Sequence, residues 1–91
     1  MIRFILGEDR HVQYFVHSTE TDTFRILSAN YELRLSGKIE ASGTCTIEAV
    51  AGGNNIDMKL QPKQRSDRYE LEITLAVADE IIKHREPMEV V

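Results

Sequence analysis

The alternation of apolar and polar side chains constrains this chain more than any other feature of its sequence. In DRYELEITLAVAD, residues 67–79, one parity carries Tyr69, Leu71, Ile73, Leu75 and Val77, and the other begins with Glu70, Glu72 and Thr74. Successive side chains of a β-strand point to opposite faces, so this period predicts a strand with one buried and one solvated face. The polar parity ends in Ala76 and Ala78, which indicates that the outer face is wet at its start and covered at its end.

The same period of two recurs along most of the chain. We expect seven strands, at residues 1–6, 11–17, 24–36, 38–50, 55–61, 67–79 and 81–91. The inward residues of 38–50 are small, which predicts a strand that crosses a narrow core or bends at Gly43. Short antiparallel strands with turn residues every 8–12 positions are typical of a β-sandwich. A small closed barrel is the main alternative.

Three local features refine this prediction. The parity of the apolar residues changes at Leu27–Ser28, which predicts a bulge or bend inside the third strand. Pro87 lacks a backbone N–H and places the last strand at a sheet edge or on a bulge. Residues 77–86 also contain good helix formers at helical spacing, so a short helix is an alternative there.

Length and cysteine content limit how the fold is stabilised. A chain of 91 residues is expected to form one domain, residues 1–91, with a thin core. Its one cysteine, Cys45, excludes an intrachain disulfide. Cys45 lies on the apolar parity of its strand, which predicts a buried thiol with a raised pKa and a packing role.

Charge argues against two classes of partner. The chain has 11 basic and 15 acidic residues and a net charge of −4, with the basic residues scattered. Binding to nucleic acid or to an anionic membrane surface requires clustered Lys and Arg, so neither partner is expected. The first residues, MIRFILGEDRH, do not form a signal peptide, and no apolar run is long enough to span a bilayer.

Catalytic and metal-binding patterns are not found in the sequence. His11 and His17 share a face but are separated by roughly 20 Å of strand, too far for one zinc ion. No serine occupies a nucleophile elbow, and the alternating Glu70 and Glu72 are typical of a solvated strand face. We therefore expect no enzyme activity and assign no catalytic, cofactor-binding or metal-binding residue.

Apolar residues on the polar parity are the candidates for an interface. Ile5, Phe15, Ala76 and Ala78 all occupy positions where a solvated face is expected. Single exposed apolar residues are normal, but a contiguous patch of them marks a contact surface. If they gather on one sheet, these four residues predict self-association or binding of a partner.

The stretch RYELEITLAV resembles the sixth strand of an immunoglobulin-like domain, with Tyr69 as its corner tyrosine and Leu71 in place of the second cysteine. Most of the chain resembles small immunoglobulin-like proteins of prophage tail and baseplate modules in Gram-positive bacteria, over the segments FILGEDRHVQYFV, ILSANYELRLSGKIEASGTCTIE and RYELEITLAVADEIIKHREPMEVV. The cysteine pair and core tryptophan of antibody domains are missing.

The resemblance implies an immunoglobulin-like β-sandwich of about seven strands with a structural role. Its expected partners are other phage structural proteins or further copies of itself, first in the bacterial cytoplasm and then in the virion. The alternative function is an accessory module that binds a glycan. That function would require exposed aromatic residues, whereas Tyr14, Tyr31 and Tyr69 are all expected to point inward.

Overall fold

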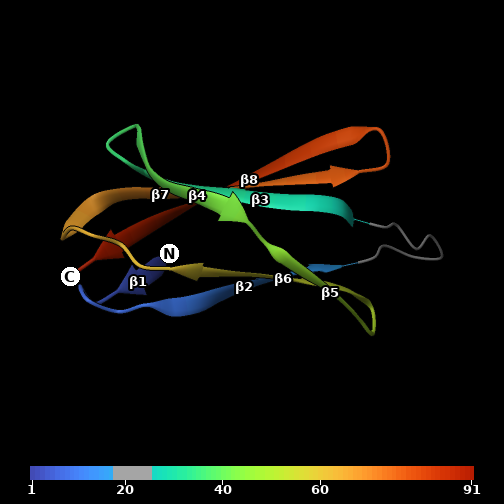
Figure 1. Ribbon diagram of the computed structural model, residues 1–91, viewed down its shortest axis with the longest axis horizontal. Coiled ribbons are helices and arrows are strands. Elements are labelled where there is room, and N and C mark those ends of the chain that lie inside the picture. The colour runs from blue at the N-terminus through green and yellow to red at the C-terminus, as the bar shows by residue number, and fades with distance from the viewer. Residues whose placement is uncertain (18–25) are drawn as a thin grey trace.

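The protein folds into two facing β-sheets (Figure 1). The computed structural model describes residues 1–17 and 26–91. The described residues form eight strands and no helix: β1 (Ile2–Phe4), β2 (Arg10–His17), β3 (Ile26–Leu35), β4 (Lys38–Thr44), β5 (Thr46–Val50), β6 (Gly53–Leu60), β7 (Ser66–Val77) and β8 (Glu80–Val90). The expected start of the third strand at Phe24 lies outside the described residues.

The two sheets differ in size. Five strands in the order β1-β8-β7-β3-β4 form one sheet, and β2-β6-β5 form the other. The pairing is antiparallel throughout except between β1 and β8, which run parallel. Because the sheets remain separate, the architecture fits the predicted β-sandwich and not a closed barrel.

The core lies between the sheets and is built by the predicted parity. In β7, Tyr69, Leu71, Ile73 and Leu75 are buried, as the alternation predicted. They pack with buried side chains from both layers, among them Phe4, Leu33, Ile56, Met58, Leu60 and Met88. Burial of apolar area is the main favourable term in folding, so this shared layer holds the two sheets together.

The expectation of one strand over residues 38–50 is wrong. The chain leaves the larger sheet after Thr44 and enters the smaller sheet at Thr46, so this segment forms two strands. Cys45 lies at the crossing, where its backbone N–H donates to the carbonyl of Ala29 at 2.8 Å. The parity continues through the crossing because both strands face the same core, and alternation alone therefore does not reveal the change of sheet.

The ring of Tyr31 explains the glycine before this crossing. A Cβ atom at Gly43 would lie 3.0 Å from a carbon of the Tyr31 ring. Tyr31 is paired with Gly43 across β3 and β4. The small residue thus lets the aromatic ring lie against the backbone of β4.

Two other local predictions have clear outcomes. The helix alternative for residues 77–86 is wrong, because β7 and β8 form a hairpin with a turn at residues 78–79. Ala78 has φ +54°, which a two-residue hairpin turn requires at its first position. The predicted bulge at Leu27–Ser28 is confirmed, since the register of β3 against β7 shifts between Ile26 and Ser28.

Glu72 lies on the outer face of the larger sheet but is not solvated as expected. Only 1% of its side chain is exposed. Its carboxylate lies 2.7 Å from Nε of Arg85, 3.1 Å from Nη1 of Arg34 and 3.4 Å from Nζ of Lys83. Hydrogen bonds from Arg85 and Arg34 lower the pKa of Glu72 to about 2. Long basic side chains from β3 and β8 therefore cover the charged half of this face.

Most of one side of β8 is open. β1 pairs only with Met88–Val90, and the described residues place no strand beside the preceding part of β8, from Glu80 to Pro87. Pro87 lies at the end of this open edge, so the prediction of an edge position is confirmed. Without an N–H it loses no hydrogen bond where no neighbouring strand is present.

Candidate functional site

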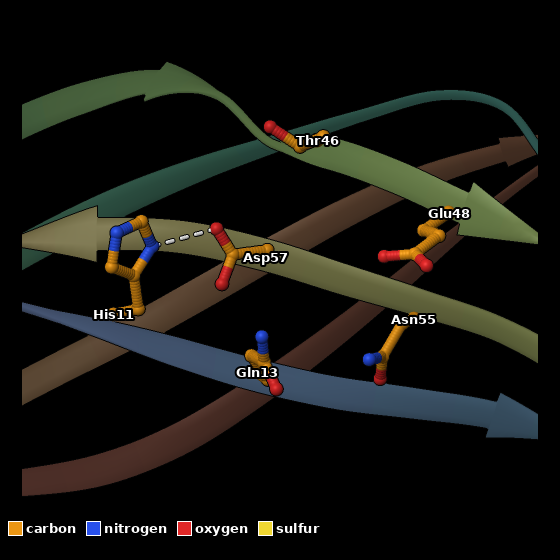
Figure 2. Close-up of a pocket in the computed structure, with 6 residues that line it drawn as sticks. All are labelled: His11, Gln13, Thr46, Glu48, Asn55 and Asp57. Atoms are coloured by element: carbon orange, nitrogen blue, oxygen red, sulfur yellow. Dashed lines mark hydrogen bonds and ion pairs between the residues drawn. The ribbon is translucent and has the colours of Figure 1, made fainter.

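A polar hollow lies on the outer face of the smaller sheet. It has a volume of about 370 Å³ and is lined by side chains of β2, β5 and β6: His11, Gln13, Thr46, Glu48, Asn55 and Asp57. Figure 2 shows these side chains projecting from the three neighbouring strands. They share a face because cross-strand partners such as Gln13 and Asp57, or Glu48 and Asn55, point the same way.

The hollow contains one direct polar contact and one unpaired acceptor. Nδ1 of His11 lies 2.7 Å from Oδ2 of Asp57 (Figure 2). The other carboxylate oxygen, Oδ1 of Asp57, is buried and has no hydrogen-bond partner among the described residues. In the described part of the chain no group of three or more His, Cys, Asp or Glu side chains is placed to hold a metal ion. The arrangement offers hydrogen-bond donors and acceptors to a polar ligand.

Phe15 lies on the same outer face, directly opposite Asn55. Its side chain is 43% exposed and meets the His17 ring edge-on at 4.6 Å between centroids. A Cβ atom at Gly53 would lie 2.1 Å from the carbonyl oxygen of Val16 and 3.0 Å from the Phe15 ring, so the glycine is required chiefly by the close backbone of β2. An exposed aromatic side chain thus adjoins the polar hollow.

A second hollow, of about 320 Å³, opens between the two sheets beside β2. Its lining is mostly apolar and comes from β2, β6, β7 and β8: Tyr14, Phe15, Val16, His17, Ile56, Ile73, Leu75 and His84. Within this lining, the ring centroids of Tyr14 and His84 lie 5.3 Å apart in an edge-on arrangement. The Tyr14 hydroxyl is buried without a partner among the described residues, and burial raises its pKa to about 12.

The open edge of β8 carries two exposed isoleucines on opposite faces. Ile81 is 64% exposed and lies opposite Ala76 on the outer face. Ile82 is 45% exposed and lies opposite Leu75 on the core side. β-Strand edges with unpaired backbone groups and apolar side chains readily pair with further strands.

The structure does not gather the four predicted interface residues into one patch. Ile5 follows β1, near Arg3, Glu8, Arg10 and Val91 at the end where the chain terminates. Phe15 lies on the smaller sheet. Ala76 and Ala78 lie at the β7–β8 turn, next to the isoleucines of β8.

Sequence reasoning missed Ile81 and Ile82 as surface residues. Two consecutive isoleucines on opposite parities were the available signal, because a strand with one buried face cannot bury both. Sequence alone also did not reveal the polar hollow, whose members come from three separate strands.

Cys45 lies where its parity predicted. It is buried, and desolvation raises the pKa of its thiol to about 11. A thiol with such a pKa is almost entirely protonated near neutral pH and is a weak nucleophile. Its position in the core confirms the predicted packing role.

Comparison with known proteins gives no relative for this chain: no family model matches, and neither a curated protein nor a solved structure matches it. Among the described residues, no helix is long and apolar enough to cross a membrane.

Proposed function

We propose that this protein is a non-enzymatic assembly module that joins other proteins through the open edge of β8. The observation that carries this proposal is the edge of β8 from Glu80 to Pro87, where the described residues place a strand on one side only and Ile81 and Ile82 are exposed on either face. Protein partners commonly add a strand to such an edge, with backbone hydrogen bonds for affinity and side chains for specificity.

The proposed fold is immunoglobulin-like. The order β8-β7-β3-β4 corresponds to the immunoglobulin order G-F-C-C′, and β2-β6-β5 corresponds to B-E-D. β1 then takes the place of a first strand that pairs with G. This correspondence supports the proposal because it requires agreement in both sheets at once.

The hydrogen bonds of Tyr69 give separate support for the proposed immunoglobulin-like fold. Its hydroxyl donates to Oε1 of Glu40 at 2.7 Å and accepts from the backbone N–H of Gln64 at 3.2 Å. A hydrogen bond from this tyrosine to backbone a few residues upstream is the tyrosine corner of immunoglobulin-like domains.

The proposed setting is a phage tail or baseplate, with other phage structural proteins or further copies of this chain as partners. It would act in the bacterial cytoplasm during assembly and afterwards in the virion. The support is the sequence resemblance in residues 4–16, 26–48 and 68–91 together with the open edge of β8.

The test combines gene neighbourhood with a binding measurement. The products of flanking genes should include tail or baseplate components, and at least one should bind the protein in calorimetry. The double variant Ile81→Lys/Ile82→Lys should abolish that binding while circular dichroism shows a folded protein. Housekeeping enzymes on both sides, or binding unaffected by the double variant, would contradict the proposal.

A glycan-binding function is the second candidate, and the polar hollow on the smaller sheet favours it. Phe15 beside Asn55 supplies the exposed aromatic residue that the inward tyrosines lack. A glycan array should then show binding that Asp57→Asn and Phe15→Ala each weaken and Ile82→Lys leaves unchanged. An array without specific binding would eliminate this candidate.

A further inference from the structure

The free edge of β8 presents backbone groups at regular intervals. A two-residue turn, residues 78–79, joins β7 and β8. Residues that flank such a turn exchange both backbone hydrogen bonds, and bonded pairs then alternate along the hairpin. Even-numbered residues from Glu80 onward therefore bond to β7. The N–H and C=O groups of Ile81, Lys83 and Arg85 point to the free edge.

From the proposed assembly role of this edge, on which the inference rests, we infer that β8 pairs antiparallel with β8 of a second copy. The two-fold axis passes through the pair formed by the two copies of Ile82. A two-fold interface of this kind is self-complementary. Opposite residues in it lie on the same face of the joined sheet and are equally distant from Ile82 along their strands.

The side chains that meet in this register are complementary. Glu80 of one copy lies opposite His84 of the other, and an imidazole N–H can donate a hydrogen bond to a carboxylate. The pair formed by Ile82 at the centre brings together two side chains that are 45% exposed in a single copy. Opposite charges and β-branched pairs directly across strands are favourable.

The neighbouring registers are worse. A register centred on Lys83 places the two Lys83 side chains opposite each other and each Glu80 opposite a Glu86, so like charges meet at three positions. Centring on His84 places Glu80 opposite Met88, where the strand edge is already occupied by Ile2 of β1.

A register centred on Ile81 is also less favourable. It leaves a ladder from Glu80 to Ile82 only, because β8 begins at Glu80 after the turn. The Ile82-centred pair is longer and extends from Glu80 to His84 of each copy. It stops before Glu86, whose carboxylate lies 3.2 Å from the N-terminal amino group of Met1.

Cysteine cross-linking tests the register directly. The two copies of Ile82 form a non-hydrogen-bonded pair with Cβ atoms about 4.5–5.5 Å apart, close to disulfide geometry. Mild oxidation of Ile82→Cys should therefore give covalent dimers, while Cys45 stays buried. His84→Cys is the matched control, because its two copies are offset by roughly 13 Å at about 3.3 Å per residue. Absence of cross-linking in Ile82→Cys, or equal cross-linking in His84→Cys, would overturn the inference.

A charge swap gives a second readout by sedimentation equilibrium, at concentrations on the order of 0.1–1 mM as expected for a small interface. Glu80→Lys should weaken the dimer roughly tenfold, since the pair occurs twice. Glu80→Lys/His84→Glu should restore it, and Asp67→Lys, at the other end of the hairpin, should have no effect. Strengthening by Glu80→Lys would indicate the Lys83-centred register and overturn ours.

Failure of this inference is distinguishable from failure of the proposed function. If the protein stays monomeric at about 1 mM but still binds another protein through Ile81 and Ile82, the pairing of two β8 strands is contradicted and the proposed function is not. A monomer with no such binding overturns both.

Discussion

The two halves of the β7–β8 hairpin differ in whether the outer edge of β8 is covered by another strand. In the half nearest the chain ends, β1 pairs with Met88–Val90 and closes the outer edge of β8. In the half nearest the turn, the described residues place no strand on the side of β8 away from β7, and Ile81 and Ile82 remain exposed. The first half is satisfied within the chain, whereas the second half leaves backbone and apolar groups for another molecule.

The largest expected effect is a loss of stability when a buried residue of the hairpin is truncated, compared with an exposed one. Leu71 is fully buried, so Leu71→Ala should reduce the free energy of unfolding by about 2–5 kcal/mol through lost burial and a residual cavity. Ile81→Ala, in the exposed half, should change it by less than about 0.5 kcal/mol. Chemical denaturation of both variants measures the difference, and equal losses would break the comparison.

A pH titration examines the covered face. The pKa of Glu72 is about 2 in the folded protein against an ordinary value of 4.5, so the folded state binds this proton less readily than the unfolded state. Its stabilising contribution is therefore complete above about pH 5 and is lost as the pH falls toward 2. Denaturation across this range should show a smaller pH dependence for Glu72→Gln. An unchanged slope would mean that the three cations do not hold the carboxylate.

Removal of the Tyr69 hydroxyl, in the half nearest the chain ends, should have a smaller effect on the free energy of unfolding. Tyr69→Phe removes the hydrogen bonds to Glu40 and to the Gln64 backbone. We expect a loss of about 0.5–1.5 kcal/mol in the free energy of unfolding. Glu40→Gln, which keeps an acceptor for the hydroxyl, is the control and should cost less.

The smallest expected effect concerns Phe15. It lies on the other sheet, away from the free edge of β8, so Phe15→Asp should leave the sedimentation behaviour of the protein unchanged. The same variant should reduce any glycan binding at the adjoining hollow. Dissociation of dimers by Phe15→Asp would move the interface from β8 to the smaller sheet.

Much of the fold could be predicted because alternation is a local property. The parity of β7 identified Tyr69, Leu71, Ile73 and Leu75 as core residues, and the parity change at Leu27–Ser28 identified the bulge. The change of sheet at Cys45 could not be predicted, since both sheets face one core and the alternation continues across it.

The candidate sites were less accessible from the sequence. The hollow around Asp57 combines β2, β5 and β6, which are brought together only by strand pairing. The free edge depends on how far β1 extends along β8. Ile81 and Ile82 carried a signal in their opposite parities, but their exposure depends on which strands are neighbours.

The sequence by itself determined that the chain forms strands with one apolar face, because side-chain direction alternates with every residue. Only the tertiary structure decided which faces and edges are covered. Glu72 is buried because Arg34 and Arg85 reach it from strands on either side. Within residues 1–17 and 26–91, the edge of β8 before Met88 has no covering strand because β1 is short. Both outcomes depend on contacts between residues distant in the sequence, which a local pattern does not encode.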